Sequence, residues 1–317
     1  MPDLPKRTLG RTALEVTTLG YGAMELRGGR GRDISEQQAE TVLNAVLDSG
    51  INLIDTSPDY GLSEERIGRY IAHRRDEYVL ASKCGCLVAV EPTAGGPRHV
   101  FTPENIRAGV EQSLSLMKTD HLDIVQFHGS PSRAELEEHG GLQALQDLQQ
   151  EGKVRFLGMS GTLPHLPDQI AMGVFDEFQT PYSALQREHE DLITAAAEAG
   201  AGTFIRGGAA KGAPSEDKAW DLGRPARPGG PADPFADGSA ERFWDAAKLD
   251  ELAEGTGRMA FTLRFTLTHP GLSTTIVGTA NPAHLAQNVE AAQAGPLPAD
   301  LYEEAKRRLT AAGATPE

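Results

Sequence analysis

Residues 51–68 read INLIDTSPDYGLSEERIG, and they contain one complete example of the unit from which the fold is predicted. Residues 51–55 are a short apolar run that ends in Asp55, a pattern typical of a buried strand. A polar loop follows, and Ser63 is a residue type that often begins a helix. A strand, a loop and a helix in this order make one βα unit.

The same alternation extends outward in both directions along the chain. The other apolar runs are rich in Val, Ile, Leu and Phe without strict alternation, which is typical of parallel strands covered on both faces. They lie at residues 17–23, 78–83, 122–128, 154–160, 175–180, 202–206 and 273–278. Eight such units in 317 residues predict an α/β protein, a single (β/α)8 TIM barrel domain over residues 1–317.

The segments between the strands carry local helix signals. Ser35 with Gln38 has the spacing of a capping box, and Thr102 precedes a proline that suits the first helical turn. Asn281 precedes another such proline. An open doubly wound sheet would carry a phosphate-binding glycine pattern after its first strand, and the LRGGRGRD of residues 26–33 lacks that spacing. The closed barrel is therefore preferred.

Two segments fall outside the alternation. Residues 7–17 are expected to form an N-terminal hairpin that closes the bottom of the barrel. Residues 212–239, dense in Pro, Gly and Asp, form a long loop after the seventh strand. A loop of this length is either a mobile flap over the site or a disordered insertion, and composition does not choose between them.

The amino-acid composition limits the classes of partner that the protein is expected to bind. With 45 Asp and Glu against 30 Lys and Arg, the net charge is −15, which disfavours nucleic acid and anionic membrane surfaces. Neither a secretory pattern in residues 1–10 nor an apolar run of about 18 residues is present, so a cytoplasmic location is expected. Cys84 and Cys86 lack the further ligands of a zinc motif and are interpreted as reduced thiols, so no metal site is predicted. Oligomeric state stays open.

Ionisable side chains gather where the predicted strands end. Asp55, Lys83 and His128 each end a strand, and Tyr60 lies in the loop after the second. Each has an ordinary explanation when taken alone, such as a loop cap, a packed ring or a solvated charge. Barrel active sites lie at the C-terminal ends of the strands, so the four together favour a catalytic site.

At these residues the chain resembles the aldo-keto reductases. The segments NLIDTSPDYGLSEERIG (52–68), VLASKCG (79–85) and LDIVQFHG (122–129) are similar to those that carry the family's Asp, Tyr, Lys and His. Weaker similarity begins at TLGRTALEVTTLGYGAM (8–24), passes through KVRFLGMSG (153–161) and FDEFQTPYSAL (175–185), and ends in residues 263–292. It covers nearly the whole chain except residues 212–239 and the C-terminal tail.

The resemblance implies an enzyme that transfers a hydride between a nicotinamide cofactor and a small carbonyl or alcohol substrate. Carbonyl reduction builds negative charge on oxygen and needs a proton donor beside it. The resemblance assigns that role to Tyr60, tuned by the ammonium of Lys83. Asp55 would keep Lys83 charged, and His128 would polarise the carbonyl.

It also implies the residues that hold the cofactor. Ser160 and Gln179 would bind the nicotinamide amide, although Gly161 stands where the family commonly has Asn. Arg206 stands where many relatives have an aromatic ring that stacks on the nicotinamide, and a guanidinium plane can also stack. Pyrophosphate contacts are assigned to Gly207, Gly208 and Lys211.

The adenosine and 2′-phosphate region is assigned to the start of the last barrel helix, since helix N-termini favour anions. Its residues are Gly278, Thr279, Asn281, His284, Gln287 and Asn288. Relatives that bind NADPH tightly often have Lys or Arg here, whereas this chain offers Gly278 and His284. NADP(H) is the expected cofactor, with NAD(H) as the alternative.

Other readings remain. A metal-dependent hydrolase on the same barrel would need clustered His and carboxylate ligands at strand ends, and none is evident in the sequence. Some barrels of this family are cofactor-holding regulatory subunits, such as those attached to potassium channels, and an NAD-preferring dehydrogenase is a further alternative. The complete set of Asp55, Tyr60, Lys83 and His128 favours catalysis.

Overall fold

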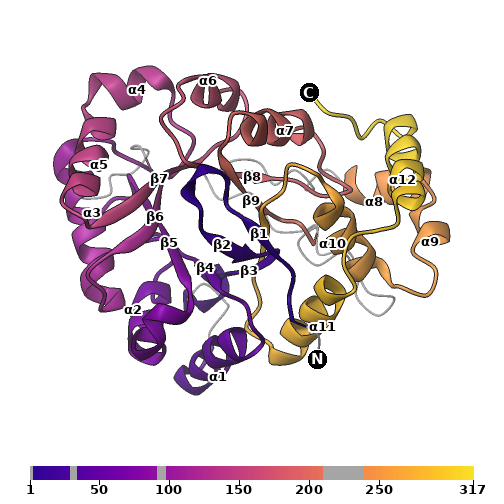
Figure 1. The fold of residues 1–317 in the computed structure, drawn as a ribbon, viewed down its shortest axis with the longest axis horizontal. Coiled ribbons are helices and arrows are strands. Elements are labelled where there is room, and N and C mark those ends of the chain that lie inside the picture. Colours follow the sequence, from indigo (N-terminus) through magenta and orange to yellow (C-terminus); the bar gives the residue numbers. More distant parts are fainter. Residues whose placement is uncertain (1–2, 29–33, 91–97, 210–238) are drawn as a thin grey trace.

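A closed parallel barrel forms the centre of the protein. The computed structural model describes residues 3–28, 34–90, 98–209 and 239–317. Within this part of the chain eight strands close in the order β10-β3-β4-β5-β6-β7-β8-β9 (Figure 1). Their bounds are β3 Leu19–Gly22, β4 Leu53–Asp55, β5 Val79–Cys84, β6 Leu122–Phe127, β7 Val154–Ser160, β8 Glu177–Pro181, β9 Gly202–Arg206 and β10 Thr274–Val277. Each predicted apolar run overlaps one of these strands, and the (β/α)8 barrel is confirmed.

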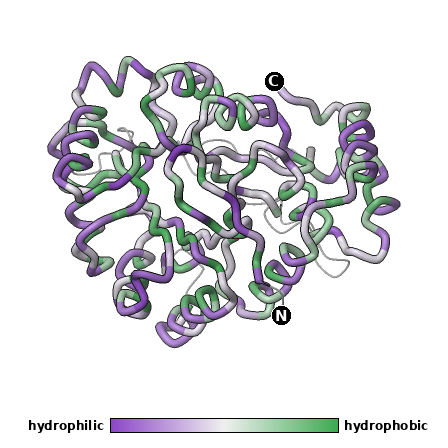
Figure 2. The backbone as a smooth tube through the Cα atoms, in the orientation of Figure 1, coloured by the Kyte–Doolittle hydropathy of each residue, from purple (hydrophilic) through white to green (hydrophobic). Residues whose placement is uncertain are grey.

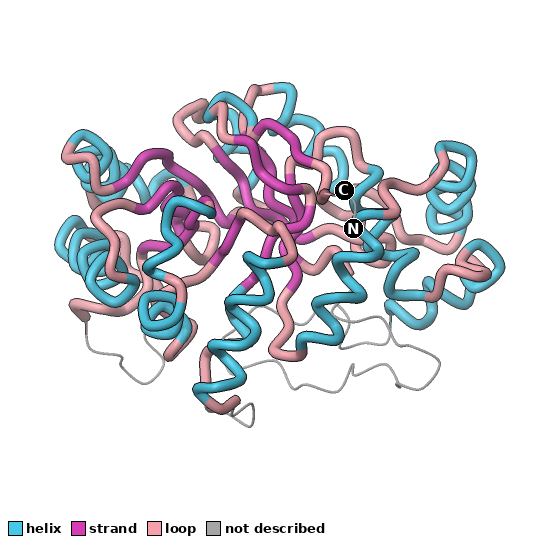
Figure 3. The backbone as a smooth tube through the Cα atoms, turned by 60° about the horizontal axis from the view of Figure 1, so that its bottom comes forward, coloured by secondary structure: helices cyan, strands magenta, loops and turns pink. Residues whose placement is uncertain are grey.

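Helices surround the strands, as the secondary-structure colours of Figure 3 show. They are α1 Glu36–Asp48, α2 Ser63–Tyr70, α3 Pro103–Met117, α4 Arg133–Glu138, α5 Gly141–Gln150, α6 Leu166–Ala171, α7 Glu190–Glu198, α8 Ser239–Ala246, α9 Leu249–Leu252, α10 Arg258–Thr268, α11 Pro282–Gln293 and α12 Ala299–Ala311. Short 3-10 turns lie at Gly10–Thr12, Ala23–Leu26 and Ala72–Glu77. Over the described residues, no helix combines the length and apolar character needed to cross a membrane.

The helices begin where the local signals predict. Ser35 Oγ accepts a hydrogen bond from the Gln38 amide at 3.1 Å, and Asn281 Oδ1 accepts from the Ala283 amide at 2.9 Å. Helix α2 begins at Ser63, but this hydroxyl does not cap the helix. It donates instead to the Ala23 carbonyl oxygen at 2.9 Å and so ties α2 to the barrel rim.

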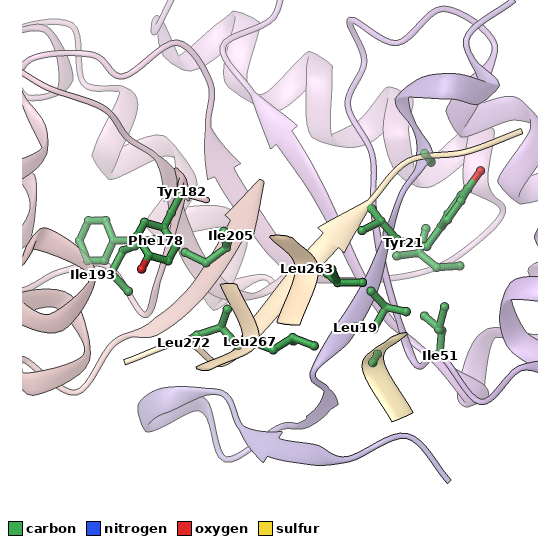
Figure 4. Close-up of a cluster of buried hydrophobic side chains, with 14 of the residues drawn as sticks. Leu19, Tyr21, Ile51, Phe178, Tyr182, Ile193, Ile205, Leu263, Leu267 and Leu272 are labelled. Carbon is green, nitrogen blue, oxygen red and sulfur yellow. The ribbon is translucent and has the colours of Figure 1, made fainter. Parts of the chain in front are cut away.

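Apolar side chains join the barrel to its helices. Hydropathy along the chain alternates on the outer helices and is more uniformly apolar on the strands (Figure 2), as expected for helices with one buried face. Figure 4 shows part of this core, where Leu19 and Ile205 of the strands lie near Leu263 and Leu267 of α10. Tyr21 is fully buried there, and its hydroxyl donates to the Thr279 carbonyl oxygen at 2.8 Å.

The predicted hairpin closes one end of the barrel. Strands β1 (Lys6–Thr8) and β2 (Glu15–Thr17) pair antiparallel with Arg7 opposite Val16, and they cross the ring of strands in Figure 1. Leu9 and Val16 are fully buried against Leu53 and Phe204 inside the barrel. The polar site described below therefore lies at the opposite end, where the strands finish.

Part of the predicted organisation lies outside the described residues. Residues 210–238 are not among them, so Lys211 and nearly all of the expected loop 212–239 cannot be placed. The same holds for residues 29–33, which include most of the glycine-rich stretch after the first barrel strand.

Candidate active site

The pairing of β4 with β5 brings Asp55 and Lys83 together inside the barrel. Asp55 lies opposite Ala81, and Lys83 follows two residues later on the same side of its strand. The Lys83 Nζ atom is 2.8 Å from both Asp55 carboxylate oxygens and donates a third bond to the Thr56 carbonyl oxygen, also at 2.8 Å. All three ammonium protons therefore have acceptors, as a buried charge requires.

The surroundings keep this pair charged. Burial works to lower the pKa of Lys83, but the Asp55 carboxylate outweighs it and the pKa is raised overall. Two neighbouring carboxyls behave differently, because burial raises the pKa of both Glu64 and Glu177. Glu64 accepts hydrogen bonds from the Ser82 and Ser113 hydroxyls at 2.6 and 2.8 Å. Of these three acidic side chains, Asp55 is the one that is hydrogen-bonded to Lys83.

Tyr60 lies directly over this pair. Its amide donates to the Ser57 carbonyl oxygen at 3.0 Å in the loop after β4, and its ring centroid is 5.3 Å from Lys83 Nζ. Burial raises the pKa of the Tyr60 phenol, while the charge of Lys83 opposes that shift. The expected influence of Lys83 is present, but in the free enzyme burial is stronger. The phenol therefore holds its proton at neutral pH.

His128 completes the predicted set. It follows β6, where its amide donates to the Cys84 carbonyl oxygen at 3.0 Å, and its ring meets that of Tyr60 edge to face with centroids 6.2 Å apart. Burial lowers the pKa of His128 to about 4, so the imidazole is neutral at neutral pH. The structure thus brings together all four side chains that the sequence nominated for catalysis.

Three further polar groups contact His128, and the sequence did not nominate them. Its Nδ1 atom lies 3.3 Å from Cys86 Sγ, 3.4 Å from Asp59 Oδ2 and 3.5 Å from Ser57 Oγ. Burial works to raise the pKa of Asp59, but hydrogen bonds with His128 and His99 lower it overall, so this side chain is a carboxylate. The positions of Ser57, Asp59 and Cys86 depend on the conformation of the loops that carry them, and the sequence has no periodic pattern that predicts it.

The next two strands position Ser160 and Gln179. These residues are direct partners in the β7–β8 register, at the same barrel rim as Lys83. Gln179 Nε2 donates to Asp55 Oδ1 at 3.0 Å, which connects the predicted nicotinamide contact to the pair of Asp55 and Lys83. Its amide oxygen is not engaged by that bond and suits an N–H donor from a carboxamide.

Arg206 closes the set from β9. It lies opposite Pro181 of β8 and Ile276 of β10. Burial lowers the pKa of its guanidinium, and the nearby Tyr60 and Asp55 oppose that shift. An arginine remains charged under such conditions. Gly207 follows with a positive φ of 73°, and the carbonyl oxygen of Gly208 accepts from Thr266 Oγ1 at 2.8 Å.

The last predicted region surrounds the N-terminus of α11. Thr279 Oγ1 accepts from the Asn281 amide at 3.0 Å, so these two side chains organise the turn that begins the helix. Gly278, His284 and Gln287 are exposed, whereas Asn288 is largely buried. His284 is the ionisable side chain of residues 278–288. An anion at this helix end would meet the positive end of the helix dipole and one imidazole, because Pro282 has no amide hydrogen and the Ala283 amide already donates to Asn281 Oδ1.

The sequence of this chain matches a known protein family. The sequence model of the aldo/keto reductase family matches residues 18–308. The chain belongs to this family. It is accordingly an NAD(P)-dependent oxidoreductase that acts on CH–OH or carbonyl groups, with a small molecule as its substrate.

Three relatives of this aldo-keto reductase match over nearly their full length. The aldo-keto reductase AKR11C1 of Bacillus halodurans, in its holo form, superimposes with a TM-score of 0.78 at 26% identity, covering 96% of both chains. D-threo-aldose 1-dehydrogenase of a Pseudomonas species is 28% identical, covering 93% of this chain and 95% of the relative. The oxidoreductase YqkF of Bacillus subtilis is 26% identical, with 91% of each chain covered.

In this aldo-keto reductase a side chain at residue 161 would force neighbouring side chains to move. A Cβ atom placed on Gly161 would lie 2.5 Å from Gln169 Oε1 and 2.9 Å from Leu166 Cδ1. Gln169 is fully buried, and its Nε2 donates to the Pro131 carbonyl oxygen at 2.7 Å. The carboxamide of Gln169 therefore fills the space beside Gly161 where an Asn would otherwise extend.

Proposed function

We propose that this enzyme reduces an aldehyde or ketone with NADP(H), or oxidises the corresponding alcohol, with Tyr60 as general acid and base. The observation that carries the proposal is the buried ion pair of Lys83 and Asp55, which lies beneath the Tyr60 ring with its nitrogen 5.3 Å from the ring centroid. Burying an ammonium and a carboxylate at this depth is costly even when both are hydrogen-bonded, and buried charges of this kind cluster at functional sites.

The protonation states suit reduction. The developing negative charge on a carbonyl oxygen needs a proton, and the raised pKa of Tyr60 means that the phenol still carries one at neutral pH. Once the proton has left, Lys83 stabilises the phenolate through its charge. Asp55 holds Lys83 in place through two hydrogen bonds of 2.8 Å.

His128 would orient the substrate. A neutral imidazole can donate to the carbonyl oxygen from Nε2 only if Nδ1 carries no proton and accepts a hydrogen bond itself. The hydroxyl of Ser57 and the thiol of Cys86 are both placed to donate to Nδ1, at 3.5 and 3.3 Å, and so favour the tautomer that the reaction needs. The Asp59 carboxylate, 3.4 Å from the same nitrogen, can only accept and favours the other tautomer.

A bound nicotinamide supplies the hydride. The residues that would hold it are Ser160 and Gln179 at the carboxamide and Arg206 beside the ring. Pyrophosphate contacts would come from Gly207, Gly208 and Lys211, and adenosine phosphate contacts from Gly278, Thr279, Asn281, His284, Gln287 and Asn288. NADP(H) is preferred to NAD(H), since His284 and the α11 N-terminus suit a 2′-phosphate. The absence of Lys or Arg from residues 278–288 makes this preference weak.

The direct test is the substitution Tyr60→Phe. We expect cofactor affinity, measured by fluorescence titration, to be retained and carbonyl reduction to fall at least about 100-fold, as for loss of a general acid. Turnover is followed by nicotinamide absorbance with a panel of aldehydes, ketones and aldoses, in both directions and with both cofactors. Aldoses are included because one full-length relative is an aldose dehydrogenase.

Tyr70→Phe is the matched control, since that hydroxyl donates to Glu36 at 2.8 Å on the outside of α2, away from the rim. Near-normal turnover by Tyr60→Phe would remove this residue from the mechanism. Cofactor binding without turnover of any substrate by the wild-type enzyme would favour the regulatory alternative.

A further inference from the structure

We propose that Asp59, Cys86, His99 and His128 form a binding site for a zinc ion or a similar transition metal at the C-terminal rim of the barrel. One donor atom from each residue lies within 4.8 Å of the other three. The inference goes beyond the proposed reductase activity and does not depend on it, because its test measures metal binding.

The four side chains come from three neighbouring loops. Asp59 lies in the loop after β4, and His128 directly follows β6. Cys86 lies two residues after β5 and pairs with His99 through an isolated antiparallel bridge, so the backbone itself sets these two side by side. Strand order in the barrel thus places all three loops next to one another.

A glycine allows the two imidazoles to approach. A Cβ atom on Gly129 would lie 2.5 Å from His99 Nδ1, so a larger residue after His128 would displace the His99 ring. With glycine there, the centroids of the His99 and His128 rings are 4.7 Å apart. Gly129 also has a φ of 88°, which other residues rarely adopt.

Three of the six distances between donor atoms are close to those of tetrahedral coordination, and all six lie within 4.8 Å. Ordinary zinc bonds to sulfur, nitrogen and oxygen place neighbouring ligand atoms about 3.3 to 3.6 Å apart around a tetrahedral ion. Cys86 Sγ is 3.3 Å from His128 Nδ1, and Asp59 Oδ2 is 3.4 Å from the same nitrogen. His99 Nε2 is 3.2 Å from Asp59 Oδ2. Small adjustments of these side chains would admit an ion at the centre.

The donor set selects the kind of metal. One thiolate, two imidazoles and one carboxylate suit Zn²⁺ or Co²⁺, whereas Mg²⁺ and Ca²⁺ prefer oxygen ligands alone. A divalent ion here would be neutralised by the charges of Cys86 and Asp59. The Cys86 thiol would release its proton to solvent as its sulfur bonds to the metal.

The site has an open side. Asp59 exposes 38% of its side chain, while His99 and His128 each expose 19%. Beside them lies a hollow of about 390 Å³ that is lined in part by Arg98, His99 and Gly129. An ion can therefore reach the cluster from solvent without passing through the barrel.

The competing interpretation is that these side chains form only a hydrogen-bonded cluster that orients His128. Cobalt distinguishes the two, since Co²⁺ bound by a thiolate in tetrahedral geometry shows intense visible absorption and a sulfur-to-metal charge-transfer band. We would treat the full-length protein with a chelator, remove the chelator, and titrate with Co²⁺ and then Zn²⁺. We expect one cobalt ion per chain with both spectral features, displaced by Zn²⁺ and not by Mg²⁺ or Ca²⁺.

Substitutions of two of the four residues test whether the signal comes from this cluster. Cys86→Ser should abolish the charge-transfer band, and His99→Gln should weaken cobalt binding at least about tenfold while the band persists at saturation. Cys84→Ser and His165→Gln are the matched controls and should bind like the wild type. The first is a buried cysteine outside the cluster, and the second lines the adjacent hollow without belonging to it.

Circular dichroism establishes that each variant is folded. Because the His99 side chain is partly exposed, His99→Gln keeps the test valid if Cys86→Ser fails to fold. Octahedral cobalt spectra without charge transfer, or equal binding by His99→Gln and the wild type, would overturn the proposal.

Discussion

Lys83 Nζ lies 2.8 Å from each carboxylate oxygen of Asp55, and neither side chain exposes more than 2% of its surface. The two charges are therefore taken out of water together. Each offsets the desolvation of the other, and removal of one leaves the other without a partner. This dependence makes the pair measurable apart from any activity.

The first prediction concerns the stability of this pair. Asp55→Asn and Lys83→Met should each lower the free energy of unfolding by roughly 3 to 5 kcal/mol, the usual cost of breaking a buried ion pair. The double variant should lose clearly less than the sum, because no unpaired charge is left. Urea unfolding of the four proteins gives the coupling free energy. Strict additivity would show that the two charges do not depend on each other.

The second prediction follows from the raised pKa of Tyr60. The phenol carries its proton below its pKa and loses it as the pH rises, so reduction should stay constant through neutral pH and decline only above about pH 10. Oxidation uses the deprotonated form and should rise with pH over the same range. Ultraviolet titration of wild type minus Tyr60→Phe reports the phenolate directly. A Tyr60 phenolate signal at neutral pH in the free enzyme would contradict this reading.

The third prediction concerns the packing of Gln169 against Gly161. Gly161→Asn should destabilise the protein by about 1 to 3 kcal/mol through overpacking. The cost should be smaller in a Gln169→Ala background, where space is free, and cofactor should then bind more tightly if the new amide reaches it. Gly152→Asn is the control, since it has open space around it and Asn tolerates its positive φ. Equal costs in both backgrounds would show that Gln169 is not the obstacle.

The fourth prediction concerns His284 in the first turn of α11. This imidazole is the ionisable side chain in the region proposed for a 2′-phosphate, and residues 278–288 contain no Lys or Arg, so the preference for NADPH over NADH should be weak. Dissociation constants of both cofactors measure it. His284→Ala should reduce the preference further. A strong preference that survives this substitution would place phosphate recognition elsewhere.

The barrel, and the gathering of the side chains proposed for catalysis, could be predicted because both rest on strong local signals. Buried parallel strands appear as apolar runs, and Asp55, Lys83 and His128 end such runs. The strand boundaries were less accurate. The run 51–55 yields a strand only from Leu53, because the Asn52 backbone amide donates to the Thr17 hydroxyl oxygen at 3.2 Å.

Other site residues could not be predicted because they depend on contacts between loops. Asp59 and His99 reach Cys86 only after three strands have aligned, and His99 is placed by a single backbone bridge. The spacing of Cys84 and Cys86 in the sequence therefore does not predict the metal site proposed above. The contact between Gln169 and Gly161 likewise depends on how α6 packs against β7, which no spacing rule encodes. The net rise in the Tyr60 pKa could not be predicted either, because it depends on how deeply the phenol is buried, and the sequence does not give that depth.

The N-terminal hairpin separates two kinds of evolutionary constraint. Leu9 and Val16 seal the end of the barrel far from the reacting groups, so substitutions there alter folding and leave the chemistry intact. Loops at the other end can diverge, gain insertions and meet new substrates without opening the core. A lineage that carries this hairpin can therefore diversify in specificity while inheriting the same stable scaffold.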